Sequence, residues 1–261
     1  MKVTVLGATG RLGSHVVDIL TARGHTVSRV ARSLGVDVIT GAGLDAALSG
    51  ADRVIDAATG PSPVAEEAAE FFTTATRTVA ASARREGVSR LIVASIIGID
   101  RFTAGYNRGK RAHEDAVRDA GLSVRIVRAA QFHEFVEQLA TWGRQGDTVS
   151  VPRMRTQLVA ARSVAEYLVD VATAPPAEFD RAPAPGFDEI AGPREENLVD
   201  AVALLMSRSG GHVELREVVD SGDPDAELYA GGALLPGADA VLAGPSYKEW
   251  LDARPVPGAA R

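Results

Sequence analysis

The 261-residue sequence contains no cysteine and few aromatic residues, and its basic side chains are outnumbered by acidic ones. Without cysteine the chain can form no disulfide, no thiolate metal site and no cysteine nucleophile. Against 34 Asp and Glu there are 28 Lys and Arg, a formal net charge of −6, so no global positive field attracts nucleic-acid phosphates. Its chemistry must therefore use other side chains.

Long apolar runs are also missing. The longest, LIVASIIGI over residues 91–99, is about half of the ~20 residues that a membrane-spanning helix needs. The first strand-like run begins near residue 2, with no signal-peptide pattern before it. We therefore expect a cytoplasmic protein whose partner is a small-molecule substrate rather than nucleic acid or a membrane, and the sequence leaves a homodimer open.

Short β-like runs alternate with helical patterns over the first two thirds of the chain. The β-like runs include KVTVLG, HTVSRVAR, DRVIDAAT, SRLIVASIIG and LSVRIVRAA. Their alternation with helices predicts βαβ units, and their nearly continuous apolar character predicts a parallel sheet covered on both faces. The sequence thus predicts an α/β fold, a Rossmann-type doubly wound parallel sheet.

Proline is concentrated in APPAEFDRAPAPGFDEIAGP, where a helix is disfavoured. We therefore expect a core domain over residues 1–155, with 156–175 returning to it, and a smaller C-terminal substrate-binding lobe over 176–261. In this lobe ENLVDAVALLMSRSGG predicts a helix that ends at glycine. Because open parallel sheets bind ligands at the carboxyl ends of their strands, we expect the lobe to cover that edge.

Three glycines, Gly7, Gly10 and Gly13, follow the first strand-like run with the spacing GxxGxxG. In dinucleotide-binding turns the first glycine allows a tight turn, the second leaves room for a pyrophosphate, and the third permits close helix packing. Backbone N–H groups at the positive end of the following helix would donate to phosphate. The residues expected to supply this turn are Gly7, Thr9, Gly10, Arg11, Leu12 and Gly13. The alternative is a purely structural turn.

The second strand-like run ends in Arg32 and Ser33, and no acidic residue occurs between Asp18 and Asp37. An acidic residue here usually holds the free ribose hydroxyls of NAD, whereas arginine suits the 2′-phosphate of NADP. The pattern predicts NADP(H) as the cofactor, with a solvated surface charge as the alternative interpretation of Arg32. After the third strand, which closes at Asp56, further cofactor contacts are expected from Ala57, Ala58 and Thr59.

Taken in order, GATGRLG, the strand-end Arg32 and Ser33, LIVASIIGID, YNRGK and VRAAQFHEF resemble the atypical short-chain dehydrogenases/reductases, specifically the NmrA-like NAD(P)H-binding group. The resemblance covers nearly the whole chain and extends to EIAGP and EWL in its last third. It implies a Rossmann core, a nicotinamide cofactor across the carboxyl edge of the sheet, and substrate specificity from the variable lobe.

Tyr106 and Lys110 in YNRGK match the YxxxK motif of catalytic members of that family. On a helix this spacing places both side chains on one face, where the ammonium would lower the pKa of the phenol and hold the cofactor's ribose. Ser95 matches the hydroxyl that orients a substrate carbonyl. The alternatives are a half-buried aromatic residue for Tyr106 and a strand-end serine bonded to local backbone for Ser95.

Other candidate residues follow the last β-like run of the core. The expected substrate pocket includes Gln131, Phe132 and His133. A local structural role is the alternative for His133, and HEFVE lacks the second histidine of HExxH, so no metal site is predicted. We expect His113 on the surface, and Trp142 and Trp250 in the core or the lobe.

These features together predict an oxidoreductase of the short-chain dehydrogenase/reductase type. The expected reaction is NADPH-dependent reduction of a carbonyl or quinone-like small molecule, with hydride from the nicotinamide C4 and a proton from Tyr106. Two alternatives remain: a non-catalytic NADP(H)-sensing regulator, and an isomerase or dehydratase that uses bound cofactor. Whether added substrates consume NADPH distinguishes them.

Overall fold

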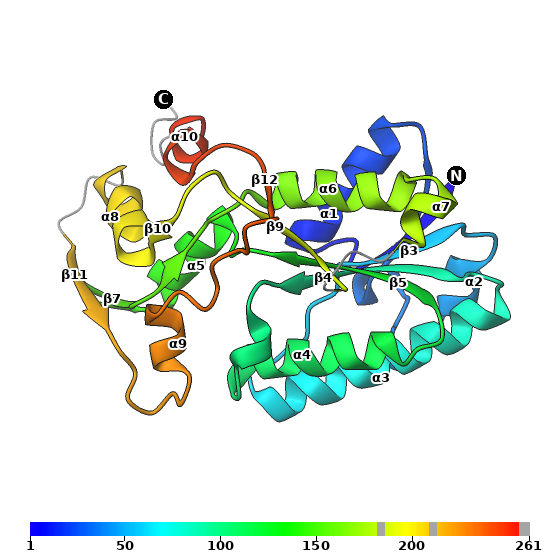
Figure 1. Cartoon of the computed structure of the whole chain (residues 1–261), viewed down its shortest axis with the longest axis horizontal. Helices are drawn as coiled ribbons and strands as arrows, with labels where there is room; N and C mark the ends of the chain where they lie inside the picture. The colour runs from blue at the N-terminus through cyan, green and yellow to red at the C-terminus, as the bar shows by residue number, and fades with distance from the viewer. Residues whose placement is uncertain (182–185, 209–212, 256–261) are drawn as a thin grey trace. The chain divides into compact units, whose positions relative to one another are not determined.

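The computed structural model describes residues 1–181, 186–208 and 213–255. Its main feature is a seven-stranded parallel sheet made of β1 (Lys2–Leu6), β2 (Thr26–Val30), β3 (Arg53–Asp56), β4 (Arg90–Ile96), β5 (Ser123–Ala129), β9 (Asp188–Ala191) and β12 (Val241–Leu242). The strand order is β12-β9-β5-β4-β3-β1-β2 (Figure 1). The predicted Rossmann-type α/β fold is therefore confirmed.

The chain forms two compact units, each built from several segments. The first contains Met1–Ile96, Ala104–Arg128 and Arg162–Asp188, and the second contains Ile97–Thr103, Ala129–Ala161 and Glu189–Arg261. The lobe expected from the proline-rich stretch begins at residue 176. The second unit also includes two earlier segments, Ile97–Thr103 and Ala129–Ala161. Because the chain passes between the units more than once, a single boundary in the sequence does not describe this division.

In the first unit, helices cover both faces of strands β1 to β5. Figure 1 shows α1 (Arg11–Ala22) and α6 (Ala161–Thr173) on one face, and α3 (Ala65–Arg85) and α4 (Gly105–Arg118) on the other. Two short helices, α2 (Leu44–Leu48) and α7 (Pro176–Phe179), complete the unit. The long α3 has glutamates in its first turn and arginines in its last, which complements the helix dipole. Among the described residues no helix is long and apolar enough to cross a membrane.

The register of the first strands brings their carboxyl ends to one edge of the sheet. Leu6, the last residue of β1, lies opposite Val30 of β2 and opposite Asp56 of β3. The segments that follow these three strands therefore start side by side. This is the edge at which open parallel sheets bind ligands.

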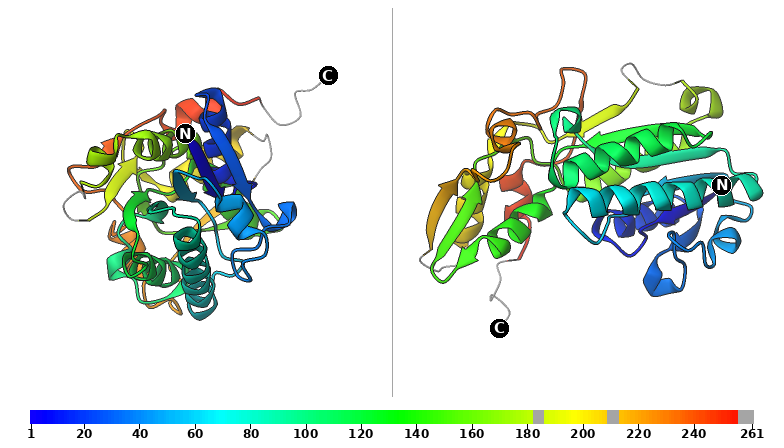
Figure 2. Two further views of the ribbon diagram at one scale, coloured as in Figure 1. Left: turned by 90° about the vertical axis from the view of Figure 1, so that its right-hand side faces the viewer. Right: turned by 90° about the horizontal axis from the view of Figure 1, so that it is seen from below.

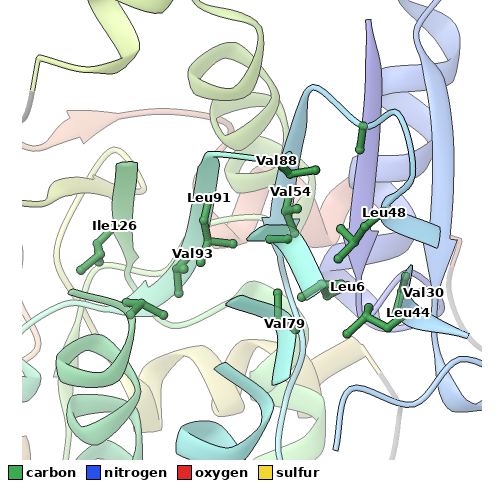
Figure 3. Close-up of a cluster of buried hydrophobic side chains, with 13 residues drawn as sticks. Leu6, Val30, Leu44, Leu48, Val54, Val79, Val88, Leu91, Val93 and Ile126 are labelled. Carbon is green, nitrogen blue, oxygen red and sulfur yellow. The ribbon is translucent and has the colours of Figure 1, made fainter. Parts of the chain in front are cut away.

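Aliphatic side chains fill the space between the sheet and the helices of the first unit (Figure 3). The labelled members of this cluster are Leu6, Val30, Leu44, Leu48, Val54, Val79, Val88, Leu91, Val93 and Ile126. Each is less than 4% exposed, and burying a Val, Leu or Ile side chain stabilises a fold by about 1.5–3 kcal/mol. The core holds the strand ends, and thus the residues that follow them, in fixed positions.

Helices α3 and α4 approach each other closely at Gly109 and run side by side in Figure 2. A Cβ added at Gly109 would lie 2.5 Å from the Cβ of Ala68 on α3. Only two small residues allow this contact, so the glycine inside YNRGK has a packing role. The contact presses one face of α4 against α3.

An ion pair in the first unit links α4 to β5. The Arg128 guanidinium donates from Nε to Glu114 Oε1 (2.9 Å) and from Nη2 to Glu114 Oε2 (2.7 Å), and both side chains are essentially buried. Arg118, which is 42% exposed, donates a third bond to the same carboxylate. Buried charges need such complete pairing, because desolvation penalises them otherwise.

The second unit combines helices with two small sheets. Its helices are α5 (His133–Trp142), α8 (Leu198–Arg208), α9 (Ala226–Ala230) and α10 (Tyr247–Asp252), and its sheets are β11-β7-β6 and β10-β8. The strands of these sheets are β6 (Arg144–Gln145), β7 (Thr148–Pro152), β8 (Arg155–Thr156), β10 (Glu196–Asn197) and β11 (Glu214–Val218). The helix expected in ENLVDAVALLMSRSGG is α8, but residues 210–211, its expected glycine end, lie outside the described residues.

Trp142, which we expected in the core or the lobe, is not a core residue. It is the last residue of α5, it contacts Phe135 edge-on, and 66% of its surface is exposed. A side chain at a helix end has neighbours on fewer sides, which explains the exposure. Trp250 does pack in the second unit, against Tyr247 and His133.

Replacing Arg128 with alanine should lower the free energy of unfolding by about 3–5 kcal/mol, because it leaves the buried Glu114 carboxylate without its main partner. Urea denaturation followed by circular dichroism measures this change. Arg118→Ala removes the exposed arm of the same cluster and should cost no more than about 1 kcal/mol. Equal losses for the two variants would contradict the assigned importance of the buried pair.

Candidate active site

The glycine turn joins the end of β1 to the start of α1. Gly7 has φ +71°, a conformation that favours glycine, and a Cβ on it would lie 2.7 Å from the Ala57 carbonyl oxygen. A Cβ on Gly13 would overlap the Gly7 carbonyl oxygen. Two of the three glycines are therefore required by backbone packing, as the spacing predicted for the first and the third.

Gly10 differs from the other two glycines. It precedes α1 with φ −79°, and a Cβ there would meet only the Gly7 carbonyl oxygen at 3.2 Å. Within 4 Å no other atom of the described residues would touch that Cβ, so the missing side chain leaves open space in front of the helix. The N–H groups of Leu12 and Gly13 have no acceptor inside α1, because they belong to its first turn. This space and these donors fit a dinucleotide phosphate.

The turn is connected to the end of β2. The Ala8 N–H donates to the Val30 carbonyl oxygen (3.1 Å), and Thr9 Oγ1 lies 3.5 Å from Ser33 Oγ. Arg32 begins the 3-10 helix η1 (Arg32–Leu34), and its side chain is exposed. The structure thus places Thr9, Arg32 and Ser33 at one end of the glycine turn, where the ribose of the adenosine half is expected.

The nearest acidic residue after β2 is already engaged. Asp37 Oδ1 accepts a hydrogen bond from the Ile39 N–H at 2.7 Å, within the loop that leads to α2. Its carboxylate therefore caps its own turn. The end of β2 offers an arginine and a serine, as the sequence indicated.

The segment after β3 contributes both structure and a hydroxyl. Asp56 Oδ1 accepts from the Ala58 N–H (2.9 Å), which fixes the turn over Ala57 and Ala58 beneath Gly7. The next residue, Thr59, places its Oγ1 2.7 Å from the Tyr106 hydroxyl. The predicted cofactor residues 57–59 and the predicted proton donor are therefore neighbours in the first unit.

Tyr106 lies in the first turn of α4 and is partly buried. Burial raises the pKa of its phenol above the usual value, the Asp56 charge raises it further, and the hydrogen bond with Thr59 only partly offsets this. The phenol is thus neutral at physiological pH. The expected lowering of its pKa by Lys110 is wrong, because burial dominates.

Lys110 is directed inward in α4. Its Nζ donates to the Ala94 carbonyl oxygen (2.8 Å) and lies 2.9 Å from His113 Nδ1, and the residue is only 4% exposed. Burial lowers the pKa of this ammonium to about 8, although the carboxylates of Asp56 and Glu114 oppose the change. Lys110 and Tyr106 do share one face of the helix, as the spacing predicted, since both contact the ring of Phe72.

The expectation that His113 is a surface residue is wrong. Only 1% of it is exposed, its ring stacks on Phe72 with centroids 4.5 Å apart, and its Nε2 lies 3.4 Å from Asp56 Oδ2. The helical spacing of Tyr106, Lys110 and His113 already contained this information, because positions i, i+4 and i+7 lie on one face.

Ser95 lies near the end of β4 and is buried. Its hydroxyl forms no hydrogen bond of ordinary geometry with the described residues, but it lies near enough to Glu114 to help lower the pKa of that carboxyl. Burial is the largest single cause and raises the pKa of the Glu114 carboxyl, but Arg128, Ser95 and Arg118 together lower it by more. Thus Ser95 is not bonded to Tyr106, and its catalytic role stays a prediction.

The expected substrate residues lie in the second unit. Gln131 Oε1 accepts from the Thr156 hydroxyl (2.6 Å), and Phe132 pairs with Val159 through the backbone. His133 is fully buried, and its Nε2 lies 3.1 Å from the Pro245 carbonyl oxygen.

The burial of His133 decides its role. Burial lowers the pKa of its imidazole, and the contact with a carbonyl requires the neutral ring to carry its proton on Nε2. Its ring also packs against Tyr247 and Trp250. These contacts support the alternative, structural interpretation of His133, whereas substrate contacts of Gln131 and Phe132 stay a prediction.

Replacing Gly10 with valine should abolish binding of a nicotinamide dinucleotide while leaving the fold intact, because the branched side chain would fill the space in front of α1. Fluorescence titration measures the binding, and circular dichroism reports the fold. Gly24→Ala is the control: an added Cβ there meets no atom within 4 Å, but φ +78° strains any side chain, so the variant should lose some stability and still bind normally. A folded Gly10→Val protein with normal affinity would show that the motif is only a structural turn.

Solved structures with the same fold include a complex with a nucleotide sugar, a reductase and an epimerase. MoeE5 in complex with UDP-glucose and NAD is 20% identical, with TM-score 0.68, over 97% of this chain and 99% of that one. The dTDP-4-dehydrorhamnose reductase from Bacillus anthracis in complex with NADP is 15% identical, with TM-score 0.69, over 96% and 97%. The UDP-N-acetylglucosamine 4-epimerase from Bacillus cereus is 18% identical, with TM-score 0.66, over 95% and 93%. At these identities the similarity concerns the fold.

Comparison by sequence gives a more specific result. No curated protein matches the chain significantly. A family model described as NAD(P)H-binding matches residues 7–175, from the first glycine of the turn to just beyond α6. The match confirms the resemblance that the motifs indicated, and it includes the glycine turn, the ends of β2 and β3, and the YxxxK helix. The chain belongs to the NAD(P)H-binding family.

Proposed function

We propose that the protein is an NADPH-dependent reductase of a carbonyl or quinone-like small molecule. The observation that carries this proposal is the Tyr106 hydroxyl, which Thr59 holds at 2.7 Å in the segment beside the glycine turn. The phenol is partly exposed and neutral, so it has a proton to donate. A positioned acid is what reduction of a carbonyl oxygen requires.

The chain's own residues suit the binding of the cofactor. The turn from Gly7 to Gly13 would hold the pyrophosphate, and the segment 57–59 would lie beneath a ribose. NADPH, when bound, supplies a hydride from its nicotinamide C4. A third N–H of Lys110, beyond those directed to Ala94 and His113, remains for a ribose hydroxyl.

The choice of NADPH over NADH follows from the end of β2. Arg32 is exposed, Ser33 lies beside Thr9, and the Asp37 carboxylate is bonded within its own turn. A guanidinium and a hydroxyl favour a 2′-phosphate by charge and by hydrogen bonding. The site has no carboxylate here for a free pair of ribose hydroxyls.

In the chemical step a carbonyl carbon gains hydride and its oxygen gains the proton of Tyr106. The phenolate left on Tyr106 then accepts a hydrogen bond from the Thr59 hydroxyl, whose oxygen is 2.7 Å away. Protonation from solvent restores the phenol. The raised pKa of Tyr106 makes the neutral form stable between turnovers.

A second candidate is a non-catalytic NADP(H)-binding regulator. The observation that favours it is the inward direction of two predicted catalytic groups: Lys110 Nζ bonds to Ala94 and His113, and Ser95 is buried near Glu114. Screening quinones, ketones and aldehydes for loss of NADPH absorbance separates the candidates. Product formation without NADPH loss would instead indicate an isomerase or dehydratase.

Arg32→Asp should remove the preference for NADPH over NADH, because a carboxylate repels the 2′-phosphate and accepts from ribose hydroxyls. Fluorescence titration with both cofactors checks this. Arg29→Asp, at an exposed arginine inside β2, is the matched control and should keep the preference. Equal affinities for the two cofactors in the unaltered protein would rule out the assignment.

Tyr106→Phe should leave the fold and the NADPH affinity unchanged but lower turnover by about 10²–10⁴-fold, the usual contribution of a general acid. Turnover is followed by NADPH absorbance with a substrate found in the screen. Thr59→Val keeps the side-chain shape without its hydroxyl and should cause a smaller loss. Full activity of Tyr106→Phe would mean that another group, such as a bound water, donates the proton.

A further inference from the structure

Lysine is scarce in this chain. Of its 28 basic residues only Lys2, Lys110 and Lys248 are lysines, and the rest are arginines. Arginine stays charged in proteins, whereas a buried lysine can lose its proton within the physiological range. Lys110 is also the buried member of the three. Its surroundings therefore decide whether the site contains a positive charge.

Lys110 belongs to a chain of three polar groups inside the first unit. Asp56 Oδ2 lies 3.4 Å from His113 Nε2, and His113 Nδ1 lies 2.9 Å from Lys110 Nζ. A carboxylate accepts only, and an ammonium donates only. The imidazole between them must therefore carry its proton on Nε2 and accept from Lys110 through Nδ1.

We propose that His113, oriented by Asp56, is a positioning residue that holds Lys110 in its charged form and leaves its third N–H for the cofactor. The proposal rests on the proposed function, in which Lys110 holds the ribose of the cofactor. It assigns a role to a histidine that lies outside the YxxxK motif. The Asp56 carboxylate then has two roles: Oδ1 caps the turn at Ala58, and Oδ2 orients His113.

Packing keeps the imidazole in this orientation. Its ring lies parallel to Phe72 with an interplanar angle of 12°, and Gly109 lets α4 lie close to α3 at this point. The Phe72 ring also lies 4.6 Å from Lys110 Nζ, which favours the ammonium. The ring plane and both nitrogens are thus fixed by contacts from three elements, β3, α3 and α4.

The charges around Lys110 favour a neutral histidine. Burial lowers the pKa of His113, and the Lys110 charge lowers it further against the opposing effect of Asp56 and Glu114. The charged groups that act on Lys110 are Asp56 on β3 and Glu114 on α4, and the titratable group in contact with it is His113 on α4. Arg128 and Arg118 already pair with Glu114, and Asp56 has the larger effect of the two carboxylates on Lys110. The acceptors of the Lys110 ammonium are the Ala94 carbonyl oxygen and His113 Nδ1.

The experiment measures the titration of Lys110 in the free protein. With only three lysines, a ¹³Cε-lysine-labelled sample gives three NMR signals, and Lys2→Arg and Lys248→Arg identify that of Lys110.

His113→Phe keeps the ring on Phe72 but removes the His113 acceptor, so the midpoint of the Lys110 titration should fall by about one pH unit. His113→Asn keeps an acceptor near the position of Nδ1, so its Lys110 midpoint should be close to that of the unaltered protein. His25→Phe, before β2, is the control and should change nothing.

A second readout links the shift to cofactor binding. In His113→Phe the NADPH affinity should be close to normal at pH 6 and should fall progressively as the pH rises to 8, because Lys110 then loses its proton earlier. A structural defect would lower the affinity equally at both pH values. An unchanged Lys110 midpoint, or a pH-independent loss of affinity, would overturn the proposal.

If His113→Phe does not fold, the tautomer in the unaltered protein gives the answer. ¹⁵N-histidine NMR at pH 7 should show His113 protonated on Nε2 alone, and a proton on Nδ1 would overturn the proposal. These NMR results need no substrate. The absence of any reducible substrate would therefore count against the reductase function without affecting the relation between His113 and Lys110.

Discussion

Close backbone contact at the carboxyl edge of the sheet is the constraint on which the site depends. Gly7 lies against Ala57 and Ala58, and Gly13 lies against Gly7, at distances that leave no room for a Cβ. These contacts bring the ends of β1 and β3 and the start of α1 together. A Cβ at Gly10 would meet only the Gly7 carbonyl oxygen, at 3.2 Å, so the turn combines a rigid frame with room for a ligand.

A second feature is the concentration of polar groups on one face of α4. Tyr106, Lys110, His113 and Glu114 lie toward the interior or its border, and each has a partner on another element or on the helix itself. An amphipathic helix normally directs apolar residues inward. In α4, paired polar and charged side chains take the place of part of that apolar surface. Their hydrogen bonds offset the free-energy cost of removing them from water.

The two buried carboxylates, Glu114 and Asp56, have different partners and therefore different roles. Glu114 is held by two arginines deep beside β5, whereas Asp56 faces His113 and the turn before Thr59. Burial raises the pKa of the Asp56 carboxyl, but the hydrogen bond from His113 and the other nearby groups outweigh it, and the net effect is a lowered pKa. Glu114 therefore anchors the helix to the sheet, and Asp56 is available to orient groups at the site.

The sequence by itself determined the parallel α/β fold, the glycine turn between β1 and α1, and the family. Alternating β-like and helical runs, together with GxxGxxG directly after the first strand, depend on local spacing, which a sequence displays. The placement of Tyr106 and Lys110 on one helical face is of the same kind.

Only the tertiary structure decided what these residues touch. Lys110 bonds to Ala94 and His113 rather than to Tyr106, and His113 is buried, because α4 packs against α3 at Gly109 and against the end of β3. The division into two units, the exposure of Trp142 and the burial of His133 likewise depend on elements distant in sequence. The burial of a side chain and its hydrogen-bond partners depend on a second element that packs against its own. The spacing of residues within one helix or strand does not say which element that is.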